Sequence, residues 1–138
     1  MVAPDIVKFF VREVLHCTCP DEIFDSAVIE SHAEICSGTR IMKKLIIGDR
    51  LLVYIAGPSG AGWTSDFINR VLAAGIRKRD LGGLNRFRLV LVTDSIENMK
   101  GTAEKVFLNF EGRDDKTHLH VIDREAVRPL ETGDSGAS

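Results

Sequence analysis

Cysteine is scarce in this 138-residue chain, and its count of three is odd. An odd count argues against a disulfide framework. The first residues, Met-Val-Ala-Pro-Asp, also lack the charged segment and apolar stretch of a signal peptide. We therefore expect a cytoplasmic protein whose thiols are free or belong to a metal or redox site.

Long apolar runs and an excess of one charge are missing too. The longest runs, such as 51–57, are far shorter than the about 20 residues that a membrane-spanning helix needs. Eighteen lysines and arginines face twenty acidic residues, which gives a formal charge of −2. This balance excludes a strongly basic nucleic-acid-binding protein. We expect neither a membrane nor a nucleic acid as a partner.

The apolar pattern predicts one α/β domain over residues 1–130. Residues 131–138 contain no apolar residue larger than alanine, and we therefore expect them to form a disordered tail. Helical spacing of apolar residues predicts helices over 4–16, 20–36, 64–79 and 96–110. Apolar runs predict strands over 41–47, 50–56, 87–93 and 118–122.

The order of these elements predicts how the sheet is built. Gly48 and Asp49 separate the first two strands and predict a tight hairpin. The later strands are joined by helices, so they should run parallel. The expected fold is a small mixed sheet of about four strands, in which a β-hairpin leads into a parallel βαβαβ unit. We expect the 41–47 strand at an edge, both crossover helices on one face, and the N-terminal helical pair on the other face or at an end.

A first candidate site is the C-x-C pair formed by Cys17 and Cys19, next to His16. The pair precedes the helix predicted over 20–36, and a helix N-terminus lowers the pKa of a thiol. Its position resembles the helix-opening cysteines of thioredoxin-like proteins, although those use mostly C-x-x-C after a strand. We predict either a redox pair, with one cysteine attacking and the other resolving, or a zinc or iron site with His16, Cys17 and Cys19 as ligands.

The remaining cysteine and two histidines bear on that site. A continuous helix over 20–36 would hold Cys36 roughly 20 Å or more from Cys19, so we expect no disulfide between them within one chain. His118 and His120 alternate onto one face of the last strand and are candidate ligands from elsewhere in the chain. The alternative is that the cysteines are small buried apolar residues and the histidines ordinary polar ones.

A second candidate site is the glycine-rich loop between the 50–56 strand and the 64–79 helix. It resembles the phosphate-binding P-loop, G-x-x-x-x-G-K-[ST], with Trp63 in place of the lysine. That replacement argues against nucleotide hydrolysis, but the helix N-terminus could still bind an anion. Asp94 ends a neighbouring strand, and it could instead cap the next helix together with Glu97. The candidate ligand-binding residues are Gly57, Gly60, Gly62, Trp63, Thr64 and Asp94. The alternative is a plain connection with the tryptophan packed on the core.

A third feature is a basic segment over residues 70–88, which has six positive charges and a single acid, Asp80. An acidic protein or a small anionic ligand could bind near Arg77, Lys78 and Arg79. The alternative is that these cations complement a helix C-terminus.

The sequence thus favours a small cytosolic protein with a thiol-based redox or metal-binding site. The competing hypothesis is a non-catalytic binding or scaffold module that holds an anionic small molecule at the Gly57–Gly62 loop.

Overall fold

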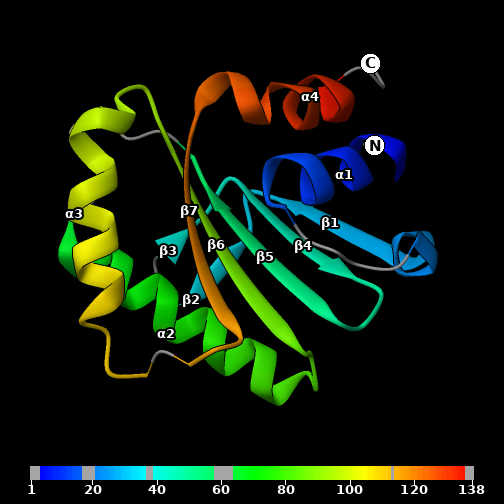
Figure 1. Ribbon diagram of the computed structural model, residues 1–138. Coiled ribbons are helices and arrows are strands. Elements are labelled where there is room, and N and C mark those ends of the chain that lie inside the picture. The colour runs from blue at the N-terminus through cyan, green and yellow to red at the C-terminus, as the bar shows by residue number, and fades with distance from the viewer. Residues whose placement is uncertain (1–3, 17–20, 37–38, 58–63, 113, 136–138) are drawn as a thin grey trace.

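A five-stranded mixed sheet forms the centre of the molecule (Figure 1). The computed structural model describes residues 4–16, 21–36, 39–57, 64–112 and 114–135. The strands lie in the order β1-β4-β5-β6-β7, with β1 and β4 antiparallel, β4 and β5 antiparallel, and β5, β6 and β7 parallel. Their bounds are β1 Ala27–Ser31, β4 Lys43–Ile47, β5 Leu51–Ala56, β6 Arg86–Thr93 and β7 Thr117–Asp123. The predicted α/β class is confirmed, with one more strand in the sheet than the four expected.

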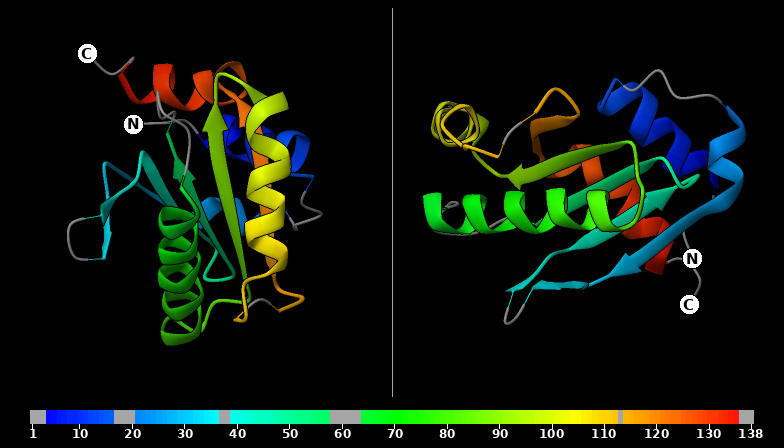
Figure 2. Two further views of the ribbon diagram at one scale, coloured as in Figure 1. Left: turned by 90° about the vertical axis from the view of Figure 1, so that its left-hand side faces the viewer. Right: turned by 90° about the horizontal axis from the view of Figure 1, so that it is seen from below.

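Helices cover both faces of this sheet (Figures 1 and 2). The crossover helices α2 (Ser65–Leu81) and α3 (Ile96–Leu108) lie on one face, as predicted. The other face holds α1 (Pro4–Phe9), its π-helical continuation η1 (Phe10–Val14), and α4 (Arg124–Ser135). With both faces covered, all six residues of β5 are buried, which explains its unbroken apolar run.

The predicted hairpin joins β4 to β5 through Gly48 and Asp49. Their φ angles, 60° and 55°, are both positive, as the two central residues of a type I′ turn require. A side chain at Gly48 would also collide with Ile23, so the turn depends on this glycine in two ways.

The helix predicted over 20–36 is wrong. Only a short 3-10 helix, η2 (Asp21–Ser26), forms there, and the chain continues as β1 and β2 (Glu34–Cys36). β2 pairs with β3 (Thr39–Arg40) in a separate two-stranded sheet. The reason is tertiary, because β1 pairs along its whole length with β4 and thereby takes the edge position predicted for the 41–47 strand. The distance argument that separated Cys19 from Cys36 therefore loses its basis.

Two smaller expectations also change. Ser95, not Asp94, is the N-cap of α3, and no side-chain hydrogen bond caps that helix end, so the predicted pair of Asp94 and Glu97 does not form. At the C-terminus, α4 continues through Ser135, five residues into the segment predicted as a disordered tail, and residues 136–138 lie outside the described part. None of the helices that the structure describes combines the length and the apolar character needed to cross a membrane.

Candidate functional site

The structure locates only some of the residues predicted to form sites. Cys17, Cys19, Gly60, Gly62 and Trp63 lie outside the described residues. His16, Gly57, Thr64 and Asp94 are described and are considered below. Among the described residues, no three histidines, cysteines, aspartates or glutamates come together as a metal-ligand set.

The described parts of the glycine loop are engaged in structural contacts. Thr64 is the N-cap of α2, and its Oγ1 accepts a hydrogen bond from the Phe67 N–H at 3.1 Å. Asp94 lies 3.5 Å from the Nε of Arg124 in an exposed ion pair. Gly57 and Asp94 follow the carboxyl ends of the adjacent parallel strands β5 and β6, the edge at which α/β sheets bind ligands. An anion at this loop stays a prediction.

The basic segment is not one surface, because Arg79 is buried. Only 5% of Arg79 is exposed, and its guanidinium donates two hydrogen bonds to the Asp114 carboxylate, of 2.7 Å and 3.0 Å. The hydrogen bond from Arg79 holds the pKa of Asp114 well below its usual range. Arg79 therefore fastens the end of α2 to the turn before β7 and is not available to a partner, whereas Arg77 and Lys78 are exposed.

A second buried arginine, Arg88 on β6, forms a cluster that the sequence did not reveal. Arg88 is 9% exposed and lies on the α1 side of β6. Its Nη1 donates to the carbonyl oxygen of Leu15 at 3.1 Å and to Nε2 of His120 at 2.9 Å. The pairing of β6 with β7 places His118 and His120 on that same face, and Arg86 lies 3.4 Å from Nε2 of His118.

The hydrogen bond from Arg88 determines the tautomer of His120. A guanidinium can only donate, so Nε2 of His120 must carry a lone pair and the ring proton sits on Nδ1. Burial, and next the charge of Arg88, lower the pKa of His120 to about 4. Burial also lowers the pKa of His118, with Arg88 and Arg86 adding to the effect. At neutral pH the positive charge of this cluster therefore resides on the two arginines.

Arg88 differs from Arg79 in having no counterion within the described part of the chain. No carboxylate of the described residues lies within ion-pair distance of Arg88, and its buried Nε donates to none of them. Burial and the neighbouring Arg86 lower its pKa. A buried cation without a carboxylate is costly, because burial removes its hydration and nothing compensates the charge. The cluster thus combines uncompensated positive charge with an unused donor.

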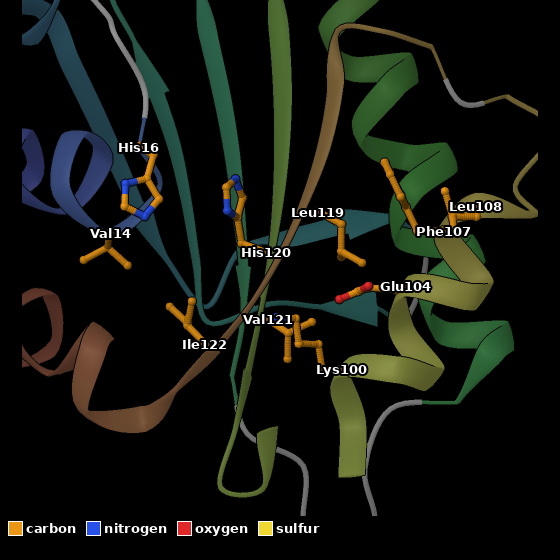
Figure 3. Close-up of a pocket in the computed structure, with 10 residues that line it drawn as sticks. All are labelled: Val14, His16, Lys100, Glu104, Phe107, Leu108, Leu119, His120, Val121 and Ile122. Atoms are coloured by element: carbon orange, nitrogen blue, oxygen red, sulfur yellow. The ribbon is translucent and has the colours of Figure 1, made fainter. Parts of the chain in front are cut away.

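A cavity of about 490 Å³ opens beside this cluster (Figure 3). His16, at the end of η1, and His120 both line it, together with Val14 and Ile122. His16 adopts a positive φ of 57°, a conformation that is uncommon for residues other than glycine. The cavity continues across β7 to α3, where Lys100 and Glu104 line it.

Two sequence patterns could have pointed to this cluster. Arg86 and Arg88 alternate in one strand, and His118 and His120 alternate in the next strand. Each pattern was visible, but only the register of β6 against β7 shows that both lie on one face.

Comparison with models of known protein families, with curated proteins and with solved structures gave no match to the chain.

Proposed function

We propose that this protein binds a small molecule through a carboxylate or phosphate group, in the cavity beside His16 and His120, with Arg88 as the cationic partner. One observation carries the proposal, namely that Arg88 is buried with no carboxylate among the described residues to neutralise it. The proposal keeps the binding-module hypothesis from the sequence and moves its site from the glycine loop to the inner face of β6 and β7.

The cluster offers chemistry suited to such a group. His120 lines the cavity and Arg88 lies behind it, so the guanidinium would attract the anion through its charge while His120 contacts the anion. His120 keeps one donor, the N–H at Nδ1, because its Nε2 already accepts from Arg88. A bound anion would favour the charged imidazole, so binding should raise the pKa of His120. At low pH, anion binding should therefore be accompanied by uptake of a proton at this histidine.

The test is a titration with inorganic phosphate and, separately, succinate. We expect the imidazole NMR signals of His16 and His120 to shift with saturation, and the melting temperature to rise. Arg88→Met should abolish both effects. Arg77→Met removes an exposed charge from α2 and is the matched control, which should respond like the wild type. Equal responses of the two variants, or no saturable shift with either anion, would contradict the proposal.

A second candidate is the thiol-based redox or metal site predicted from the sequence. It is favoured by the cavity that His16 and His120 share, since His16 directly precedes Cys17 in the chain. His120 would then be the remote imidazole for a zinc or iron ion held by His16, Cys17 and Cys19, with its Nε2 exchanging the hydrogen bond from Arg88 for the metal. Arg88 would instead stabilise a thiolate if the pair is catalytic. This function would suit the reducing cytoplasm, where we place the protein.

Thiol reactivity separates the second candidate from the first. Cys17 or Cys19 should react with iodoacetamide below pH 7 faster than Cys36 does, and elemental analysis of anaerobically purified protein should find zinc or iron if the pair binds metal. Slow, equal labelling of all three cysteines in metal-free protein would contradict the redox and the metal function, while leaving anion binding untouched. An acidic partner at Arg77 and Lys78 stays a prediction of its own.

A further inference from the structure

The strand β7 is an open edge of the sheet. It ends the strand order, and only β6 pairs with it among the described strands. The Phe87 N–H donates to the carbonyl of Lys116 at 3.0 Å. This hydrogen bond shows which backbone groups of β7 face β6. In a parallel ladder alternate residues bond to the same neighbour, so the even-numbered residues of β7 face β6. Leu119 and Val121 therefore direct their N–H and C=O groups outward.

This edge lacks the features that usually protect an edge strand. From Thr117 to Asp123 there is no proline and no lysine, and the register with β6 is unbroken by a bulge. The cavity of Figure 3 touches four consecutive residues of β7, Leu119 to Ile122, whose side chains alternate between the faces. Only a cavity that runs along the strand edge can touch all four. A groove thus follows the outer edge of β7.

We propose that this groove holds β7 of a second copy of the chain, antiparallel and related by a two-fold axis through His120. This register sets Leu119 opposite Val121 of the second copy, so that their outward backbone groups exchange hydrogen bonds. The five strands of each copy would join into one ten-stranded sheet. The imidazoles of the two His120 residues meet at the axis, and they are neutral at pH 7 because burial lowers their pKa.

Charge complementarity along α3 favours a second copy over an unrelated strand. Lys100 and Glu104 line the groove one helical turn apart. Since α3 runs antiparallel to β7, Lys100 lies near the level of Val121 and Glu104 nearer that of Leu119 (Figure 3). The same two-fold axis therefore places Lys100 opposite Glu104 of the second copy, and the reverse. Leu108, which is 61% exposed at this edge, would be covered in the pair.

A charge exchange on α3 tests this dimer without touching Arg88. Sedimentation velocity should find a dimer, and Glu104→Lys or Lys100→Glu alone should raise its dissociation constant about tenfold or more, because each sets two pairs of like charges together. The double variant Lys100→Glu with Glu104→Lys should restore the wild-type constant. Lys78→Glu, on the exposed surface of α2, should change nothing. Circular dichroism checks that each variant is folded.

Hydrogen exchange identifies the surface used. The Leu119 and Val121 amides should be protected in the dimer and should exchange quickly in Glu104→Lys. A protein that stays monomeric at millimolar concentration would overturn the proposal, as would a dimer in which these two amides exchange freely or both single variants bind normally. The anion site lies on the α1 side of β7, where Val14 and His16 line the cavity, whereas the added strand would lie along the edge beside Lys100 and Glu104. Arg88→Met leaves α3 unchanged, so the two proposals can fail separately.

Discussion

At the scale of single residues, two arginines in the described part of the chain are buried, and they differ in what neutralises them. Arg79 has Asp114 at 2.7 Å and Asp80 at 3.0 Å. Arg88 has a backbone carbonyl and an uncharged imidazole. The Arg79 arrangement is a structural clamp, because the fold itself neutralises its charge and accepts its hydrogen bonds. The Arg88 arrangement leaves positive charge that no carboxylate of the described residues balances, and the anion site is proposed on that ground.

The clamp at Arg79 can be tested by removing its acid. Asp114→Ala should lower the free energy of unfolding by about 3 kcal/mol, because the buried guanidinium loses two hydrogen bonds and keeps only the exposed Asp80 as an acidic partner. Asp115→Ala removes the neighbouring exposed carboxylate and should cost less than about 0.5 kcal/mol. Urea denaturation at pH 7 measures both. If the two variants lose the same stability, the clamp contributes nothing.

The lowered pKa of His120 predicts a pH effect on stability. Between pH of about 6.5 and about 4 the unfolded chain binds a proton at this histidine and the folded protein does not. Stability should therefore fall as the pH is lowered through this interval, by an amount on the order of 3 kcal/mol from His120. Asp114 affects stability in a different pH range. Because its pKa is lowered in the folded protein, its contribution to the free energy of unfolding is lost only below about pH 4.

Urea denaturation at several pH values separates these contributions. His120→Gln should flatten the fall in stability between pH of about 6.5 and about 4. The control is His32→Asn, which replaces an exposed histidine at a positive φ of 54° with a residue that tolerates that conformation, and which should keep the wild-type slope. A His120→Gln slope equal to that of the wild type would show that this imidazole titrates normally.

At the scale of elements, two helical glycines differ in the space around them. A Cβ at Gly75 of α2 would collide with the ring of Phe87 on β6, so this glycine lets the helix approach the sheet. A Cβ at Gly101 of α3 would meet nothing within 4 Å. Gly75→Ala should thus destabilise the protein by about 1–3 kcal/mol through overpacking. Gly101→Ala should stabilise it by about 1 kcal/mol through helix propensity. Thermal unfolding of the two variants decides this, and a gain in stability from Gly75→Ala would contradict the packing described.

The elements that could be predicted are those with local signals. Gly48-Asp49 marks the hairpin, and Thr64 and the apolar spacing after it mark α2. The strand β1 had no such signal. Its apolar residues at 27, 28 and 29 fit a helix or a strand, and pairing with β4, some sixteen residues away, decided between them. The secondary structure of this segment therefore depends on a contact that no local pattern encodes.

At the scale of the whole molecule, the candidate site is a property of register. The arginines come from β6 and the histidines from β7, about thirty residues apart, and they meet because two parallel strands align Arg88 with His118. The sequence led to His16 and to both histidines as possible ligands, but it paired them with thiols and assigned the arginines to an exposed patch. The site depends on which side chains share a face, and that follows only from the assembled sheet.

The pKa of His120, followed by NMR with and without inorganic phosphate, is the decisive measurement for the anion site proposed beside Arg88. The structure predicts a value of about 4 in the absence of phosphate, and anion binding beside Arg88 predicts a rise when phosphate is added. In Arg88→Met the value without phosphate should already be higher, because a neighbouring positive charge is gone, and phosphate should no longer change it. A pKa near the ordinary 6.5 that is the same with and without phosphate would contradict both the buried Arg88–His120 pair and the function proposed for it.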